Sequence, residues 1–523
     1  MGDPVKNTFV LLAVGALGLA PWLAPSGVAA APPAAAQVGA QLPTLGDGNV
    51  MTSSAERRLG DRIAREIYRD PDYIDDPVLA EYVQGIWQPL LAAARARGDL
   101  SSELDERYAW EVMLGRDRTV NAFALPGGYL GLHLGLIAVV GSRDELASVL
   151  GHELSHVTQR HISRLMSKQS QQTPWLIGAM ILGALAASKS ADAGNALIVG
   201  GQAVAAQGQL NFSRDMEREA DRVGFGVMTQ AGFNGQGFVT MFDKLQQANR
   251  LNDVGAYPYL RSHPLTTERI AEVQSRQALV ARPAGALALT IEHAMISARA
   301  RVLSNAGVDA LRAMVAEAAG KQLTGPPARQ AGVLYGAAAA STQLRDLTTA
   351  RDCLDRLRAL VGADLPGARL LRLQEAETAL VFGDAALAAK VLHNAMPAAP
   401  ERRPELLLAA QLAAQPGQGA LVSATAQRLQ DWVGAHPRDA LAWQRLSGLY
   451  TLQGRTQSAI RADAETQVAQ LDYAAALDRL RAAQELSRQG GGASAAADHI
   501  EASIIDTRRR QVELLLREQA LER

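Results

Sequence analysis

Residue character changes abruptly near residue 281, and this change constrains the fold more than any single motif does. Residues 53–278 mix amphipathic helical patterns with runs that have the alternation and turns of β-strands. Beyond residue 284, Ala, Leu, Arg and Gln recur at helical spacing, while aromatic and β-branched residues become less frequent. A chain of 523 residues is also too long for one ordinary core. We therefore expect a mainly α protein, with an α+β domain at 37–280 and an all-α domain at 281–523.

The downstream part carries a weak helical repeat. In "ALAWQRLSGLYTLQGRTQSAI", Trp443, Leu446, Tyr450 and Ala459 stand at the offsets expected in a tetratricopeptide unit, and Ser447 replaces the usual Gly. One helix pair cannot bury its apolar face alone, so such pairs must stack on their neighbours. We expect a tetratricopeptide-like solenoid, and an irregular helical bundle is the alternative.

The first 36 residues have the composition of a secretory signal peptide. Lys6 precedes an apolar run from Phe9 to Ala20, and small residues follow, with candidate cleavage points after Ala30 and Ala36. A membrane span needs roughly 20 apolar residues, and this run is shorter. The pattern therefore favours an exported protein over one held by a single membrane anchor.

Overall composition narrows the function classes. Hydrophobic residues make up 48% of the chain and charged residues 20%, as in a globular protein. The net charge of -1 provides no electrostatic case for nucleic acid as the main partner. Because Cys353 is the only cysteine, an intrachain disulfide and a multi-cysteine zinc site are both excluded.

The stretch "GHELSHVTQRH" at 151–161 holds three of the nine histidines and contains an H-E-x-x-H motif. A capping box at Ser142 predicts that a helix begins well before it. On that helix His152 and His156 share a face, so both imidazoles can reach one cation. Glu153 can then take a proton from a water whose pKa zinc lowers to about 7. A surface helix with incidental histidines is the alternative.

A catalytic zinc also needs a third protein ligand and an open fourth position. The segment "FSRDMEREADRVGFGVMTQAGF" predicts a second helix on which Glu217 and Asp221 share a face, whereas Glu219 points elsewhere. One of the two carboxylates can bind zinc while the other hydrogen-bonds a ligating histidine. A charged helix in solvent is the alternative.

Four segments together resemble the M48 family of zinc metallopeptidases, in this order: N-A-F-A-L-P-G-G-Y-L-G-L-H-L-G-L-I at 121–137, H-E-L-S-H at 152–156, E-R-E-A-D at 217–221 and S-H-P-L-T-T-E-R-I-A-E at 262–272. The resemblance covers about 53–278. It implies a zincin-like fold with a small edge-exposed sheet and one zinc ion per chain. It further implies that Glu217 is the third zinc ligand and that Asp221 is the supporting carboxylate.

The segment "PGGYLGLH" predicts a strand with Tyr129, Gly131 and His133 on one face. If this strand were a free edge beside the zinc, an extended substrate could add to it through main-chain hydrogen bonds. The resemblance favours this role, and an ordinary core strand is the alternative.

His263 follows from the resemblance as a further site residue. It could stabilise the oxyanion of the tetrahedral intermediate, or it could occupy the open zinc position at rest. A merely solvated loop histidine is the third interpretation. The apolar segment 174–207 is too short in its first run to span a bilayer. We expect there either a hairpin lid that contacts clients or the membrane surface, or two buried helices.

The resemblance, joined to the signal peptide and the repeats, implies a periplasmic zinc endopeptidase with a chaperone-like role. Its expected substrates are misassembled or stalled outer-membrane proteins, and its repeat domain would dock on the outer-membrane β-barrel assembly machinery. A repeat-based chaperone or scaffold with latent peptidase activity is the alternative. A purely structural metal site is a third interpretation, and the intact Glu153 argues against it, since such a site needs no base.

Overall fold

The computed structural model describes residues 51–168, 212–251, 255–280, 289–320, 323–395, 401–489 and 495–521. The predicted signal peptide and the apolar segment 174–207 lie outside these ranges. Within them, no helix combines the length and the apolarity that crossing a membrane requires. Helices dominate the described residues, and the strands form one small sheet, so the expected mainly α fold with an α+β amino-terminal part is confirmed.

The sheet has three strands, β1 (Glu111–Gly115), β2 (Ala122–Leu125) and β3 (Tyr129–His133), in the order β1-β3-β2. Strand β3 is parallel to β1 and antiparallel to β2. The prediction that residues 129–133 form a free edge is therefore wrong, because β3 is the central strand. Its five residues are all buried, so both of its faces serve the core. The edges are β1 and β2, and β2 lies against the helix that carries the H-E-x-x-H motif.

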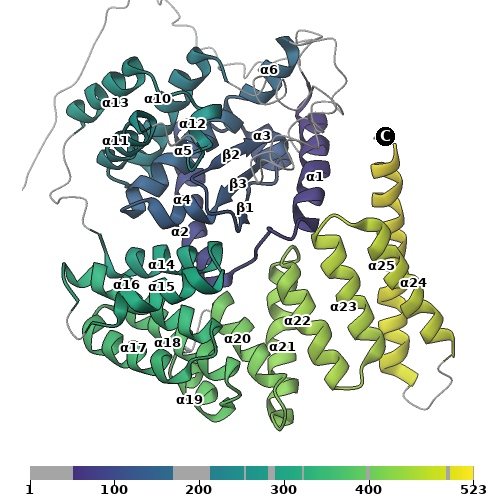
Figure 1. Cartoon of the computed structure of the whole chain (residues 1–523). Coiled ribbons are helices and arrows are strands. Elements are labelled where there is room, and N and C mark those ends of the chain that lie inside the picture. Colours follow the sequence, from purple (N-terminus) through teal and green to yellow (C-terminus); the bar gives the residue numbers. More distant parts are fainter. Residues whose placement is uncertain are drawn as a thin grey trace, which may run out of the picture. The chain divides into compact units, whose positions relative to one another are not determined.

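The remaining elements of the amino-terminal part are helical (Figure 1). They are α1 (Ser53–Arg69), α2 (Pro77–Arg97), α3 (Ser102–Arg107), a short 3-10 turn (Pro126–Gly128), α4 (Leu134–Val139), α5 (Arg143–Thr158), α6 (His161–Lys168), α10 (Arg214–Gln230), α11 (Gln236–Arg250), α12 (Tyr259–Ser262) and α13 (Thr267–Leu279).

Helix α5 is the buried axis of this part. Its start is capped as expected, since the hydroxyl of Ser142 accepts a hydrogen bond from the Glu145 amide at 3.1 Å. The helix is buried continuously from Glu145 to Thr158. It packs closely on α10, where a Cβ on Gly224 would lie 2.9 Å from backbone atoms of Gly151. The two glycines therefore let the backbones of the two candidate metal-binding helices touch.

From residue 291 onward every element is a helix, within the ranges that the structure describes. The helices are α14 (Ile291–Ser304), α15 (Val308–Ala318), α16 (Pro327–Gln343), α17 (Leu347–Val361), α18 (Leu365–Val381), α19 (Ala385–Ala395), α20 (Arg403–Ala413), α21 (Gly419–Ala435), α22 (Ala440–Leu452), α23 (Thr456–Ala469), α24 (Tyr473–Gln489) and α25 (Ala495–Ala520). The first helices of successive pairs begin at residues 291, 327, 365, 403, 440 and 473, so 33 to 38 residues separate them. Each pair packs on the next (Figure 1), as expected of stacked repeats.

Arginines of three first helices tie this array to the segment around the start of α2. Each guanidinium binds one carboxylate of that segment and one carboxylate of a later repeat: Arg299 binds Asp76 and Glu377, Arg369 binds Glu81 and Glu405, and Arg403 binds Asp75 and Asp439. One hydrophobic cluster also runs from α2 through α14 to α18. The array and α2 therefore share both apolar and ionic contacts.

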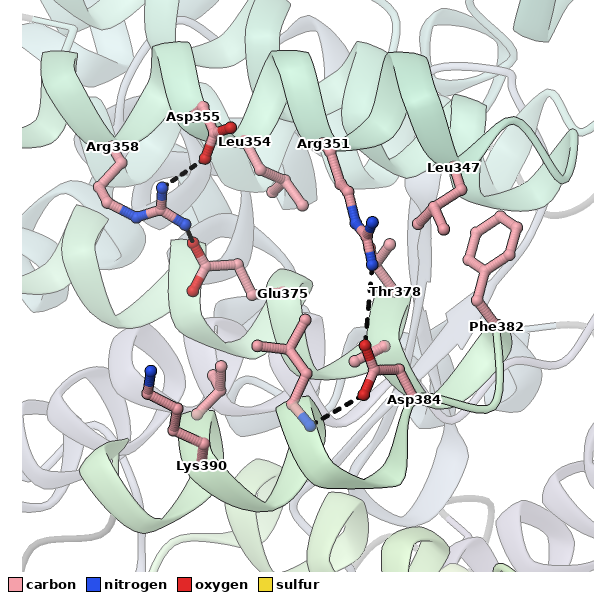
Figure 2. A pocket seen from close by; sticks show the side chains of 13 residues that line it. Leu347, Arg351, Leu354, Asp355, Arg358, Glu375, Thr378, Phe382, Asp384 and Lys390 are labelled. Carbon is pink, nitrogen blue, oxygen red and sulfur yellow. Dashed lines mark hydrogen bonds and ion pairs between the residues drawn. The ribbon is translucent and has the colours of Figure 1, made fainter.

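A pocket of about 420 Å³ lies between α17, α18 and α19 (Figure 2). Its charged side chains largely neutralise one another, because Arg358 binds Asp355 and Glu375, and Arg351 lies 3.7 Å from Asp384. It contains no histidine. This pocket is therefore separate from the chemistry that the H-E-x-x-H motif predicts.

Candidate metal centre

Four buried side chains converge on one point between α5, α10 and the end of α12. They are His152 and His156 of α5, Glu217 of α10, and His263, which directly follows α12. One nitrogen or oxygen atom from each lies within 4.8 Å of all the others. The structure thus brings the three predicted metal ligands together and adds His263 to them.

The distances within this group suit a tetrahedral ion. The Nε2 atoms of His152 and His156 are 2.9 Å apart, and the Glu217 carboxylate oxygens lie 3.4 and 3.5 Å from them. His263 Nδ1 lies 3.0 Å from a Glu217 oxygen and 3.3 Å from His152 Nε2. Ligands held at 2.0–2.1 Å from a tetrahedral zinc ion are roughly 3.3 Å apart. The donor set of imidazole nitrogens and one carboxylate is also one that zinc prefers.

The protonation preferences of His156 and Glu217 agree with metal binding. Burial, with the charge of His152, lowers the pKa of His156 well below its ordinary value, so its imidazole is neutral as a ligand must be. Burial alone would raise the pKa of Glu217, but the neighbouring imidazoles of His263 and His152 hold it well below its ordinary range. Glu217 is therefore a carboxylate at neutral pH.

Glu153 lies beside this group and is completely buried. Its nearest ionic neighbour is His263, whose Nε2 lies 3.5 Å from a Glu153 oxygen. Burial raises the pKa of Glu153, and the nearby imidazoles of His263 and His152 offset only part of that effect. A carboxylate with an elevated pKa beside a metal group is suited to exchange a proton with a water molecule there.

A carboxylate supports His152 from the side of its ring away from the metal group. Asp221 Oδ1 lies 2.9 Å from His152 Nδ1, as expected for the supporting carboxylate. Asp221 in turn accepts two hydrogen bonds from Arg269, at 2.6 and 2.8 Å. The same guanidinium lies 2.8 Å from Glu217. Burial alone would raise the pKa of Asp221, but Arg269 holds it below its ordinary value.

His263 is not a solvated loop residue, since only 2% of its surface is exposed. Its ring stacks on Tyr259 with the centroids 4.5 Å apart. The Phe212 ring packs at a tilt against that of His156, with the centroids 4.0 Å apart, and its centroid lies 5.7 Å from that of His263. Aromatic rings therefore hold the histidines of the group in place.

Comparison with known families identifies the amino-terminal part. Residues 81–277 match the sequence profile of Peptidase family M48, and this range contains all four residues of the metal group. The chain carries an M48 peptidase domain. The resemblance to this family that the motifs predicted is confirmed over these residues.

Several named proteins are similar to the chain. A putative beta-barrel assembly-enhancing protease of Vibrio cholerae is 36% identical over 273 residues, which cover 52% of this chain and 54% of that protein. The Beta-barrel assembly-enhancing protease of Yersinia pestis is 29% identical over 429 residues, 81% of this chain and 83% of that protein. Mitochondrial metalloendopeptidase OMA1 of Saccharomyces cerevisiae is 28% identical over 194 residues, 36% of this chain and 53% of that protein. The chain thus spans about half the length of the first and third.

Two further sets of contacts in the M48 domain, those of Arg269 and of Glu219, could not be predicted from the sequence. Arg269 stands in the quoted segment 262–272, but its sequence position does not indicate a partner on α10. Glu219 does point away from the metal group, as expected. It accepts hydrogen bonds from His161 at 3.1 Å and from Arg164 at 2.8 Å, and is therefore not merely solvated. The only signal for His161 was its place as the third histidine of the motif stretch.

Proposed function

We propose that the chain is a zinc-dependent endopeptidase in which His152, His156 and Glu217 hold one zinc ion and Glu153 is the general base. The observation that carries this proposal is the convergence of the three side chains at ligand spacing, with the buried Glu153 carboxylate beside them. The M48 domain match and the metalloendopeptidase name of a relative support it.

The residues of the site divide the reaction between them. When bound, zinc polarises the scissile carbonyl and lowers the pKa of the attacking water. Glu153 takes a proton from that water and later delivers it to the leaving amine. The Asp221 carboxylate lies 2.9 Å from His152 Nδ1 and so favours the tautomer that has its proton on Nδ1 and its Nε2 facing the ion. Arg269 keeps Asp221 ionised and forms ion pairs with both Asp221 and Glu217.

His263 acts in this proposal as a resting cap on the fourth ligand position. Its Nδ1 lies as close to Glu217 and His152 as a fourth ligand would. The ring must swing away before a substrate carbonyl can enter. The other role, stabilisation of the oxyanion, predicts the opposite effect of removing the side chain.

Substrate binding is assigned to the outer edge of β2, not to β3. Strand β2 pairs only with β3 among the described residues and lies against α5, which carries two of the proposed ligands. An extended peptide could add to this edge through main-chain hydrogen bonds that do not depend on side-chain identity. Such binding suits unfolded substrates of varied sequence.

The names of the Vibrio and Yersinia relatives supply the cellular context of the proposal. The chain would act in the periplasm on misassembled or stalled outer-membrane proteins and support β-barrel assembly. The helices from α14 onward would form a tetratricopeptide-like docking domain for the assembly machinery. The 33- to 38-residue spacing of the helix pairs is close to the 34 residues of such a repeat.

A second function is favoured by one observation, the presence of His263 within the ligand group. If its imidazole caps the ion permanently, the chain would be a repeat-based chaperone or scaffold with latent peptidase activity. This function would leave the proposed zinc site intact, so metal content alone does not separate the two.

The test is hydrolysis of casein, an unfolded substrate, by wild type and by Glu153→Gln. We expect the variant to keep its zinc and its fold and to lose activity by about 10²- to 10⁴-fold, because general-base activation is gone. Zinc content and the thermal unfolding midpoint are the controls. Wild-type turnover in the variant would refute Glu153 as the base, and a wild type without activity would favour the scaffold.

A further inference from the structure

A chain of hydrogen bonds lies behind His156, on the side of its ring away from the metal group. His161 Nδ1 lies 2.9 Å from His156 Nδ1, and His161 Nε2 lies 3.1 Å from a Glu219 oxygen. The His161 side chain is completely buried, whereas Glu219 is 26% exposed and also binds Arg164. His161 is not one of the four residues whose ligand atoms converge.

The backbone between α5 and α6 is strained so that His161 can reach this place. Arg160, the residue before His161, has a φ of 54°, in the left-handed region that a non-glycine residue seldom adopts. Its guanidinium is held at 2.7 Å from the buried Glu56. His161, the first residue of α6, directly follows Arg160. Strain of this kind persists only where the surroundings enforce it, and it often marks a functional position.

The positions of the protons in this series of hydrogen bonds follow from the orientation of His156. Its Nε2 faces the metal group, so its proton is on Nδ1, and that N–H donates to His161 Nδ1. The proton of a neutral His161 is then on Nε2, where it donates to the Glu219 carboxylate. Every donor in the sequence His156, His161, Glu219 meets an acceptor.

We infer that His161 is a positioning residue that, together with Glu219, fixes the ring of His156 and strengthens it as a metal ligand. This inference rests on the proposed zinc site. The two α5 histidines are supported in different ways, since Asp221 contacts His152 directly while Glu219 acts on His156 through an intervening imidazole. The Glu219 carboxylate accepts a hydrogen bond from Nε2–H of His161. This polarises the His161 ring and makes its Nδ1 a better acceptor for His156.

Two substitutions of His161 separate its two hydrogen bonds. In His161→Asn the side-chain oxygen stands near the former Nδ1 position, so it can accept from His156 but cannot reach Glu219. In His161→Gln the terminal amide stands near the former Nε2 position, so it can reach Glu219 but leaves His156 without an acceptor. Glu219→Ala removes the last acceptor in this series of hydrogen bonds. Because Glu219 is partly exposed, the substitution leaves the packing of the core unchanged.

The measurement is the zinc dissociation constant of the full chain, obtained by competition with a chromophoric chelator, together with the absorption spectrum of the cobalt-substituted protein. We expect His161→Gln to weaken zinc binding by about 10- to 100-fold and to alter the cobalt spectrum. His161→Asn should restore most of the affinity, and Glu219→Ala should weaken binding by several-fold. The thermal midpoints of the metal-free variants show whether folding is intact, and Glu219→Ala decides if His161→Gln is unfolded.

Two results would overturn the inference. Equal zinc affinities in wild type, His161→Gln and Glu219→Ala would show that the chain of hydrogen bonds does not act on the metal. Equal losses in His161→Asn and His161→Gln would show that packing is the cause. In either case wild type still binds zinc, whereas a wild type that binds none would contradict the proposed metal site as well.

Discussion

Among single residues, His263 is the one for which two chemical roles predict opposite outcomes. Its imidazole is buried, stacked on Tyr259, and within contact distance of both Glu217 and Glu153. A group in this place can hold the fourth ligand position closed, or it can donate a hydrogen bond to a developing oxyanion. The short approach of Nδ1 to the proposed ligands supports the closed resting state.

His263→Ala should therefore raise the rate of casein hydrolysis, because the fourth position is no longer blocked. If the imidazole instead stabilises the oxyanion, the same substitution should lower the rate by about a hundredfold. Initial rates of wild type and variant at equal zinc content distinguish the two roles. An unchanged rate would contradict both of them.

Between elements, the contact of α5 with α10 sets the distance from the histidines to Glu217. The backbones of the two helices meet at Gly151, which directly precedes His152, and at Gly224 of α10. A side chain at either glycine must push the two helices apart. The metal group spans the same interface, so its geometry depends on this close approach.

Gly224→Ala should weaken zinc binding and destabilise the fold by about 1–3 kcal/mol, because the added Cβ overpacks the contact. Gly434→Ala is the matched control and should be neutral or slightly stabilising, since Gly434 lies in α21 and a Cβ there would meet no atom of the described residues within 4 Å. Urea unfolding and chelator competition measure both effects. A Gly224→Ala protein as stable as wild type would contradict the importance of this close packing.

Features of the site that depend on local spacing could be predicted from the sequence. The two histidines of α5 and the pairing of Glu217 with Asp221 follow from helical periodicity, and Ser142 marks the start of α5 by its own side chain. The position of β3 did not follow, because strand order depends on how the chain crosses the sheet and not on the alternation within one strand. The roles of His161 and Arg269 could not be predicted either, because their partners lie on other helices and helical spacing within one segment does not indicate such contacts.

Across the whole described chain, three arginines join the helical array to the segment that starts α2. Arg299 is the most buried of them and makes hydrogen bonds to Asp76, Glu377 and Tyr335. Burial alone would lower the pKa of Arg299, but Asp76 and Glu377 raise it well above its ordinary value. The charge is therefore retained and compensated, which makes the loss of one partner costly.

Arg299→Met should destabilise the protein by about 3–5 kcal/mol, because it leaves the buried Asp76 without its cation. Arg301→Ala is the control, since its ion pair with Glu317 is exposed and worth about 0–1 kcal/mol. Urea unfolding midpoints of the two variants give the comparison. Equal small effects would show that the array does not depend on this ionic contact.

The central claim for the M48 domain is that His152, His156 and Glu217 hold one catalytic zinc ion. The zinc content of purified wild type and of Glu217→Ala tests this claim most directly. Elemental analysis after dialysis should find about one zinc per wild-type chain, as expected for a site with three protein ligands, and a small fraction of that in the variant. Unchanged zinc occupancy in Glu217→Ala would contradict this assignment, because the third ligand would then lie elsewhere.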